Sequence, residues 1–412
     1  MDKNKRLTVW LPVIIAASIA LGIFIGNHYL SISQGKKRSY SSGNKINAIL
    51  DIIDEQYVDT VSMSKLVEST IPKIFSELDP HSVYIPAEDA SVVNEELEGS
   101  FSGIGVSFNM QTDTILVISG GPAEKAGLLP FDRIISINDS IFSGKKKNQG
   151  EIMKTLRGAK NSTVKLGVQR GNSPELLYFD VTRGDVPVNS VDVSYEAAKG
   201  IGYIKVSKFA RNTYNEFITA IAKLKQAGCT SFVIDLRGNT GGYMDAAINM
   251  INEFMPEGRL IVYTEGKSFP RSDVYANGTG TCKDAPIVVL TDEISASASE
   301  IFSGAIQDND RGTIIGRRTY GKGLVQTQMS LSDGSEMRLT IARYYTPSGR
   351  CIQKKYEMGN TDAYDQDIYN RYMHGEFDSA DSIKMDDSLK YQTVGGRTVY
   401  GGRYHARYLY PS

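Results

Sequence analysis

The strongest constraint on the fold is a regular alternation of strand-like and helix-like segments that begins near residue 185. Strands are expected at GIGYIKVSKF, TSFVIDLRG, APIVVLTDE and MRLTIARYYTP, and amphipathic helices at NEFITAIAKLKQAG, MDAAINMINEFM and SEIFSGAIQD. This order is typical of helices packed on a mostly parallel sheet. It predicts a layered α/β domain in which ligands bind at the carboxyl ends of the strands.

The N-terminus is interpreted as a membrane anchor. Lys3, Lys5 and Arg6 precede an uncharged stretch from Leu7 to Gly26, which has the length that a bilayer requires. A cleaved secretory peptide is the alternative, but the apolar stretch is long for one and no clear A-x-A site follows it. We therefore expect an uncleaved signal anchor at residues 1–30 and a polar linker at 31–44. The rest of the chain would lie in the periplasm or another extracytoplasmic space of the cell envelope.

Composition excludes several classes of function. A net charge of -1, with scattered Lys and Arg, gives no electrostatic case for a nucleic-acid partner. The three cysteines are far apart, so neither a zinc site nor a disulfide framework is indicated. Only four histidines occur, which makes a Ser-His-Asp triad improbable. His81, which follows the second helical pattern in residues 45–97, is interpreted as a turn residue.

Residues 98–184 form a separate β-rich module. Short alternating strands, a Gly-Pro turn and a short helix at AEKAGL resemble a PDZ domain, although Phe131 stands where that family usually has a glycine. The resemblance implies that a loop with successive backbone N–H groups binds the carboxylate of a chain terminus, while the peptide adds to a sheet edge. The residues of that loop are Gly103, Ile104, Gly105 and Val106. A structural module without a ligand is the alternative.

The stretch DEISASASEIFSG places three serines among alanines where a strand ends and a helix starts. Ser297 and Glu300 fit a capping box, in which the serine satisfies free N–H groups of the helix. The position also suits a nucleophile, because the helix dipole and the next N–H can stabilise an oxyanion. A base is then required, and Lys322 in RTYGKGLVQT could act as one if burial lowers the pKa of its amine. Gln326 could orient that amine; an exposed turn lysine is the alternative.

Three motifs in this order, DLRGNTGG, SASASE and YGKGLVQ, together with the PDZ-like module before them, resemble the carboxyl-terminal processing peptidases of family S41. These are serine peptidases with a Ser-Lys dyad. The resemblance implies that Ser297 is the nucleophile, Lys322 the general base and Gln326 the partner of that base. It also implies an oxyanion hole formed by the backbone N–H groups of Gly242 and Ala298.

The same resemblance implies a crotonase-like (ClpP/crotonase-type) layered α/β peptidase core at residues 185–402. An inserted PDZ-like β barrel, N-terminal helices and a transmembrane anchor would complete the chain. The implied function is a serine endopeptidase that processes unfolded or loosely folded proteins from their C-termini, with neither metal nor organic cofactor. LDPHSVYIP also resembles a family stretch and favours a structural role for His81. A homo-oligomer is compatible with this assignment, and a catalytically silent, membrane-tethered peptide-binding scaffold is the alternative function.

The C-terminal part departs from the family. TVGGRTVYGG approaches a segment that normally continues Gly-Gly-Ile/Val-x-Pro-Asp, but RYHARYLYPS follows here. One set of synonymous codons for that peptide, read one base later, encodes Gly-Ile-Met-Pro-Asp-Ile-Phe-Ile-Pro. We interpret residues 403–412 as an aberrant tail produced by a one-base frameshift near Arg403, which the nucleotide sequence of the gene can test. Before it, the acidic, tyrosine-rich residues 356–387 are expected to form a solvated helical insertion.

Overall fold

The computed structural model describes residues 16–23, 42–109, 114–117, 121–141, 149–383 and 385–402. The chain divides into two units, Met1–Ser69 and Thr70–Ser412. In the first unit, residues 16–23 are helical, helix α2 spans Ser42–Gln56, and helix α3, Met63–Ser76, begins. These two helices confirm the helical pattern expected after residue 45.

The predicted anchor at residues 1–30 lies outside the described residues except for the helical stretch 16–23. Among the residues that the structure describes, no helix is both long enough and apolar enough to cross a membrane. The anchor therefore stays a prediction. The linker at 31–44 lies mostly, and the tail at 403–412 wholly, outside the described residues.

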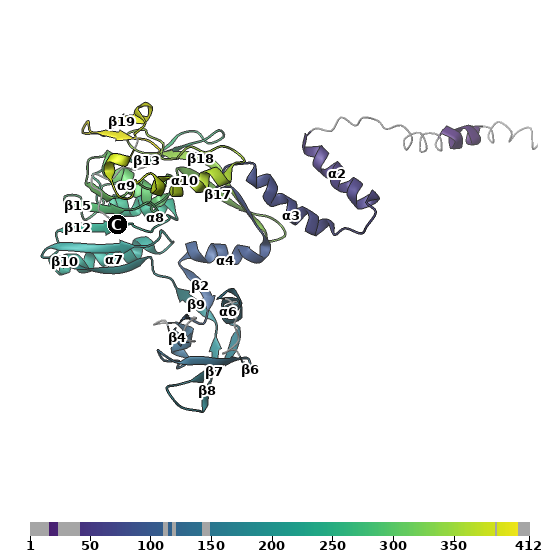
Figure 1. Ribbon diagram of the computed structural model, residues 1–412, viewed down its shortest axis with the longest axis horizontal. Coiled ribbons are helices and arrows are strands. Elements are labelled where there is room, and N and C mark those ends of the chain that lie inside the picture. The colour runs from purple at the N-terminus through teal and green to yellow at the C-terminus, as the bar shows by residue number, and fades with distance from the viewer. Residues whose placement is uncertain are drawn as a thin grey trace, which may run out of the picture. The chain divides into compact units, whose positions relative to one another are not determined.

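The second unit contains the predicted, mostly parallel sheet (Figure 1). Its strands are ordered β10-β11-β12-β15-β16; the last four are parallel, and β10 is antiparallel to β11. The bounds are β10 Val191–Ala198, β11 Ile201–Val206, β12 Ser231–Asp235, β15 Ile287–Thr291 and β16 Thr313–Gly316. The motifs DLRGNTGG and DEISASASE follow β12 and β15, which are neighbours, so their first residues meet at one edge of the sheet.

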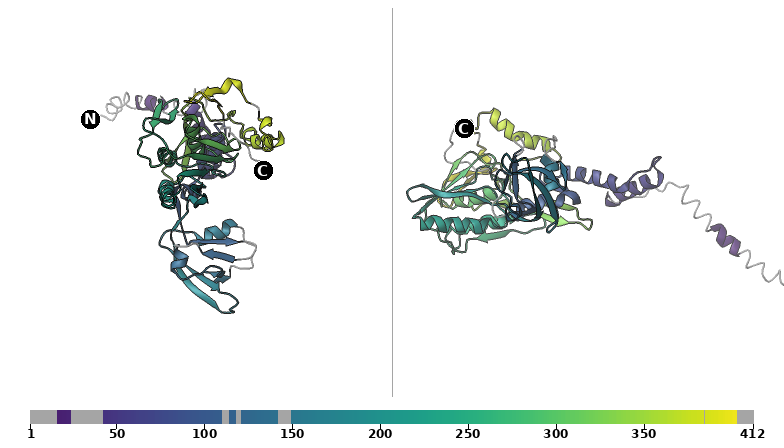
Figure 2. Two further views of the ribbon diagram at one scale, coloured as in Figure 1. Left: turned by 90° about the vertical axis from the view of Figure 1, so that its left-hand side faces the viewer. Right: turned by 90° about the horizontal axis from the view of Figure 1, so that it is seen from below.

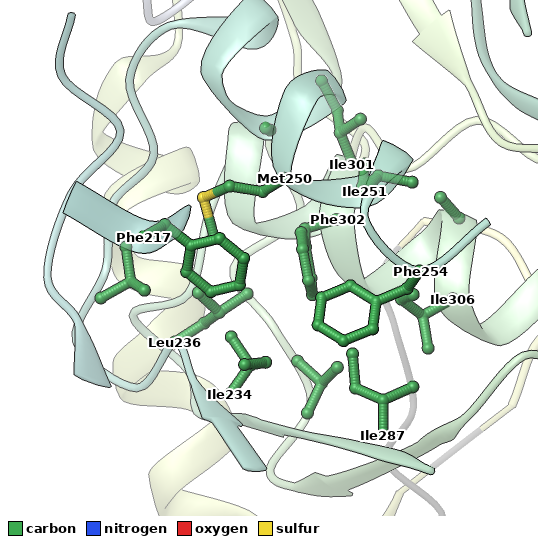
Figure 3. Close-up of a cluster of buried hydrophobic side chains, with 14 of the residues drawn as sticks. Phe217, Ile234, Leu236, Met250, Ile251, Phe254, Ile287, Ile301, Phe302 and Ile306 are labelled. Carbon is green, nitrogen blue, oxygen red and sulfur yellow. The ribbon is translucent and has the colours of Figure 1, made fainter. Parts of the chain in front are cut away.

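Three helices alternate with these strands and bury the main apolar core. They are α7 Thr213–Gln226, α8 Met244–Asn252 and α9 Ala298–Asp308. The ring of Phe254 lies edge to face with those of Phe217 and Phe302, at centroid distances of 6.2 and 6.4 Å (Figure 3). Each such pair contributes about 0.5–1.5 kcal/mol beyond the area that it buries. Every residue of α9 is buried, so the helix that begins beside Ser297 has a fixed position.

A second sheet is antiparallel and joins distant segments of the chain. It runs β1-β18-β13-β14, with β17 paired to β18. The bounds are β1 Val83–Ile85, β13 Leu260–Glu265, β14 Ser272–Tyr275, β17 Leu324–Ser330 and β18 Glu336–Tyr345. The strand expected at MRLTIARYYTP is thus present as β18, but it belongs to this sheet and not to the parallel one. Through the β1–β18 pairing, the residues that follow His81 are held beside the β17–β18 hairpin.

The β-rich module has its own core within the second unit. Helix α4, Ala87–Glu98, precedes it, and its helices are α5 Pro122–Lys125 and α6 Gln149–Leu156. Its strands are β2 Ser100–Gly103, β3 Val106–Asn109, β4 Thr114–Val117, β5 Arg133–Ile137, β6 Ser140–Ile141, β7 Thr163–Gln169, β8 Leu176–Thr182 and β9 Gly184–Pro187. Ile104, Leu128 and Leu166 are among the residues of its buried cluster. Phe131, in the usual glycine position, has φ 71° and an exposed side chain, a conformation that costs about 1–2 kcal/mol for a residue with a Cβ.

The segment expected to be a solvated insertion is only partly solvated. It forms helix α10, Thr361–Met373, and two short 3-10 turns, Ala380–Ser382 and Asp387–Leu389. Tyr364, Arg371 and Glu376 in it are buried. Glu376 forms ion pairs with both Arg318 and Arg371, so this segment is tied to the chain that leads to Lys322.

The last described elements are held by a buried ion pair. Strands β19, Lys390–Gln392, and β20, Thr398–Tyr400, form a hairpin, and the yellow C-terminal segments lie against green elements of the same unit (Figures 1 and 2). The fully buried Arg350 pairs with Asp308 at 2.5 Å and donates to the carbonyl of Tyr400 at 2.8 Å. Arg350 therefore links the end of α9 to the C-terminal hairpin.

We predict that Arg350→Met lowers the free energy of unfolding by about 3–5 kcal/mol, because it leaves the carboxylate of Asp308 buried without its cation. Urea unfolding followed by circular dichroism measures this. The matched control is Arg397→Met, which breaks the more exposed pair with Asp310 and should cost less than about 1 kcal/mol. Equal losses in the two variants would contradict the assignment.

Candidate active site

The three serines of SASAS have different environments. The hydroxyl of Ser295 donates to the carbonyl of Leu236 at 2.8 Å, and that of Ser299 donates to the carbonyl of Asn239 at 2.9 Å. Both serines are fully buried. Ser297 is half-buried and lines a cavity of about 960 Å³. The outer two serines thus tie the start of α9 to the loop after β12, and the middle one faces the space that a substrate could enter.

The backbone of Ser297 is strained. Its φ is 54°, in the left-handed region that costs a residue with a Cβ about 1–2 kcal/mol. The N–H of Ser297 donates to the carboxylate of Glu300 at 2.9 Å, which is one half of the predicted capping box. Gly241 lies directly against this turn: a Cβ there would come within 2.7 Å of the Ser297 Cβ. The neighbouring residues hold Ser297 in this strained conformation at the helix N-terminus. Strained residues of this kind cluster at active sites.

The two predicted oxyanion donors lie next to Ser297. Gly242 lines the cavity and has φ 138°, and a Cβ on it would overlap the carbonyl of Phe209. Ala298 is fully buried. Within the described residues, the N–H of neither residue donates to another protein atom. Both N–H groups are therefore available to an oxygen that carries developing negative charge.

Asn239 fixes the geometry of this corner. Its side chain donates to the carbonyl of Val206 at 2.9 Å and accepts from the N–H of Gly241 at 2.8 Å. Its own carbonyl accepts from the N–H of Ala296 at 3.0 Å. The asparagine thus connects β11, the glycine turn and the residue that precedes Ser297. Sequence reasoning missed this role, although Asn239 stands inside DLRGNTGG.

Lys322 lines the same cavity as Ser297. It lies in the loop between β16 and β17, where Gly321 has φ 93° and a Cβ on Gly323 would come within 2.6 Å of the backbone of Gln353. The amine of Lys322 donates to Oε1 of Gln326 at 3.1 Å. The amide of Gln326 in turn donates to the backbone carbonyl of His81. The structure therefore brings together Ser297, Lys322 and Gln326, which the sequence separates.

The surroundings of Lys322 favour a neutral amine. Burial is the main cause that lowers the pKa of Lys322, and the positive charge of Arg338 lowers it further, against the charges of Asp79 and Glu300. A lysine with a lowered pKa can accept a proton from a hydroxyl. The exposed turn lysine that the sequence left open does not fit this half-buried position.

His81 is not a second base of this site. Burial, followed by the nearby charge of Lys322, lowers the pKa of His81 to about 4. The ring is therefore neutral at pH 7, and its Nε2 is 2.9 Å from the hydroxyl of Tyr364. What His81 contributes to Gln326 is its backbone carbonyl, which agrees with the structural role expected from LDPHSVYIP.

Glu300 connects the two halves of the site. Its carboxylate is fully buried, and one oxygen accepts from the N–H groups of Ser297 and Lys322 at 2.9 and 2.8 Å. The other oxygen accepts from the hydroxyl of Thr319 and the N–H of Gly321. Burial raises the pKa of Glu300 to about 7, while the four donors act in the opposite direction. The capping-box pattern predicted the contact with Ser297. The other three donors lie in the loop between β16 and β17, and the sequence gives no sign that this loop contacts α9.

The predicted carboxylate loop of the β-rich module is formed at the end of β2. The side chain of Ile104 is buried in the core of the module, and its carbonyl accepts from the N–H of Ala123 at 2.7 Å. Gly105 has φ 72°, and a Cβ there would lie 3.0 Å from Gly121. Gly103 and Val106 flank this turn as the last residue of β2 and the first residue of β3. The loop can thus offer backbone groups, rather than side chains, to a ligand.

Comparison with known proteins gives two family matches. The sequence matches the peptidase family S41 over residues 200–362 and the PDZ domain over residues 102–192. The carboxy-terminal processing protease CtpB of Bacillus subtilis (strain 168) is 35% identical over 318 residues, which are 76% of this chain and 66% of that protein. A probable CtpA-like serine protease of Staphylococcus aureus (strain N315) is 33% identical over 365 residues, which are 86% of this chain and 72% of that protein.

Two solved structures are also similar. The photosystem II D1 C-terminal processing protease is 28% identical, with a TM-score of 0.43, over 76% of this chain and 91% of that chain. A putative S41 protease from Bacteroides fragilis is 15% identical, with the same TM-score, over 80% of this chain and 97% of that one.

The family matches define a serine-type peptidase with an α/β catalytic core and a PDZ domain. The resemblance seen in the sequence is thereby confirmed. The chain belongs to peptidase family S41, together with relatives that are named a carboxy-terminal processing protease and a probable CtpA-like serine protease.

We predict that Glu300→Gln lowers the rate of peptide hydrolysis at least about tenfold and the free energy of unfolding by about 1–3 kcal/mol. All four partners of the carboxylate are donors, so an amide would place its NH₂ group against an N–H or O–H. Cleavage of a test protein and urea unfolding measure the two effects. Glu257→Gln, at an exposed position, is the matched control, and unchanged hydrolysis by Glu300→Gln would show that the carboxylate does not hold the site.

Proposed function

We propose that this chain is a serine endopeptidase that cuts proteins near their C-termini with a Ser297–Lys322 dyad. The observation that carries the proposal is that Ser297, Gly242 and Lys322, whose pKa is lowered mainly by burial, line one cavity. The first relative, of which this chain covers 66%, is named a carboxy-terminal processing protease. That name supports the proposal that this chain also acts on protein C-termini.

The reaction follows from the positions of the groups. The neutral amine of Lys322 accepts the proton of the Ser297 hydroxyl as its Oγ attacks the carbonyl carbon of a peptide bond. The N–H groups of Gly242 and Ala298 stabilise the tetrahedral oxyanion. The ammonium of Lys322 then gives its proton to the leaving nitrogen, and an ester to Ser297 remains. Lys322 next takes a proton from water, the hydroxide attacks the ester, and Ser297 leaves with that proton. Gln326 directs the amine throughout.

The finer parts of the fold belong to the same proposal. The core is of the crotonase-like type, with its helices and two sheets stacked in layers, and the PDZ domain binds the substrate C-terminus through the backbone of residues 103–106. The N-terminal residues 1–30 anchor the chain in a membrane, with the catalytic core in the periplasm or another extracytoplasmic space. The uncharged stretch from Leu7 to Gly26 supports the anchor.

We predict that Ser297→Ala and Lys322→Ala each lower cleavage of an unfolded test protein by more than about a thousandfold, because each removes a group that takes part in bond formation. Circular dichroism should show an unchanged fold. Ser330→Ala and Lys223→Ala change exposed residues of the same types and should keep full activity. A serine-directed phosphonyl probe should label Ser297 in the unaltered protein. Absence of both labelling and cleavage would favour the silent peptide-binding scaffold.

We predict that the PDZ domain binds a peptide with an apolar C-terminal residue and a free carboxylate, and that Gly105→Val weakens binding at least about tenfold. The substitution puts a branched side chain at φ 72° against Gly121. Fluorescence anisotropy on the Ser297→Ala background avoids cleavage of the peptide. The amidated peptide is the control, and equal affinity for the free and amidated forms would rule out carboxylate recognition by this loop.

A further inference from the structure

The hydroxyl of Tyr344 lies between the two residues of the dyad. Tyr344 is in β18, and it is 1% exposed. Its hydroxyl is 3.1 Å from the backbone carbonyl of Ser297 and also contacts the backbone carbonyl of Lys322. The hydroxyl has one proton to donate, so the two carbonyls share it. One buried oxygen atom therefore connects the nucleophile and the base through their main chains.

Glu300 makes the complementary contact on the other side of both residues. A single oxygen of its carboxylate accepts from the N–H groups of Ser297 and Lys322 at 2.9 and 2.8 Å. Each member of the dyad is thus contacted at its N–H by Glu300 and at its carbonyl by Tyr344, and the carbonyl of Ser297 also accepts from the N–H groups of Glu300 and Ile301. The side chains of Glu300 and Tyr344 come from different elements, α9 and β18. Their contacts with the dyad therefore do not follow from one local sequence motif.

Tyr344 is itself fixed independently of these contacts. The N–H of Tyr344 donates to the carbonyl of Gly323 at 3.0 Å, and Tyr344 is opposite Thr264 in the antiparallel pairing of β18 with β13. Its ring belongs to the main apolar core. A phenylalanine would fill the same apolar space and keep the strand pairing, but it would leave both carbonyls without the shared proton.

We propose that Tyr344 is a positioning residue which, with Glu300, clamps the backbone of Ser297 to the backbone of Lys322 and so sets the distance between hydroxyl and amine. The inference rests on the proposed function, in which these two side chains exchange a proton. Such a clamp is required because Lys322 is in a loop between two glycines and Ser297 has a strained φ. Proton transfer depends on a heavy-atom separation of about 2.6–3.2 Å, and these shared contacts join the two backbones that carry the reacting side chains.

The test compares Tyr344→Phe with the full chain in peptide hydrolysis. We expect kcat to fall about 100-fold, the effect of a displacement of about 1 Å, with KM nearly unchanged. The low-pH limb of the kcat profile should move to higher pH, because a loosened amine is better hydrated and is protonated more readily. Labelling of Ser297 by the phosphonyl probe should slow in parallel.

Tyr345→Phe is the matched control. Tyr345 follows Tyr344 in β18, and its ring stacks on Tyr263, so this variant should keep the kcat and the pH profile of the unaltered chain. Glu300→Asp provides a second variant if Tyr344→Phe does not fold. It keeps the carboxylate but shortens its reach, and it should also lower kcat with little change in KM.

The outcomes separate this inference from the proposed function. If the unaltered chain cleaves and Tyr344→Phe has the same kcat and pH limb, the clamp is wrong and the Ser-Lys mechanism stands. Unchanged kcat in folded Glu300→Asp would overturn the clamp as well. If the unaltered chain neither cleaves nor reacts with the probe, the proposed function fails first and the clamp fails with it.

A combined Tyr344→Phe, Glu300→Gln variant should lose less activity than the product of the two single effects, because both substitutions release the same pair of residues.

Discussion

A buried carboxylate, that of Glu300, is the contact on which the rest of the active site depends. It receives the N–H of Ser297, which directly precedes α9, and three donors from the loop before β17. A buried charge without these donors would be costly in this position, so the donors stabilise the ionised carboxylate. Burial of Glu300 therefore depends on the same backbone donors that bring Ser297 and Lys322 together.

Other contacts with backbone groups also hold the chain around Ser297 in place. Asn239 ties the glycine turn after β12 to the residue before Ser297, and Gly241 fits against Ser297 because it has no Cβ. The strained φ of Ser297 is kept by these neighbours, since the isolated turn would relax to a conformation with lower energy. Rigidity at the nucleophile is thus a property of the packed core, in which α9 has no exposed residue.

Much of the fold was predictable because hydrophobic periodicity is a local signal. The pattern located the parallel strands β11, β12 and β15 and the helices between them, and the PDZ-like strands and turn were recognised in the same way. Periodicity could not assign β18 to its sheet, because strand pairing is decided by segments far apart in the sequence. For the same reason the insertion that contains α10 was expected to be solvated, although Tyr364 and Glu376 are buried by contacts with distant residues.

The sequence by itself determined which chemical groups were available: a serine at a helix start, a lysine between glycines, a glutamine four residues later and only four histidines, none placed for a Ser-His-Asp triad. Motif order determined the family. Only the tertiary structure decided that Lys322 is half-buried beside Gln326, that His81 offers a carbonyl and not a base, and that Tyr344 and Glu300 reach both residues of the dyad. The physical reason is that burial and hydrogen bonding depend on which segments of a folded chain meet, and that information is absent from any single stretch of residues.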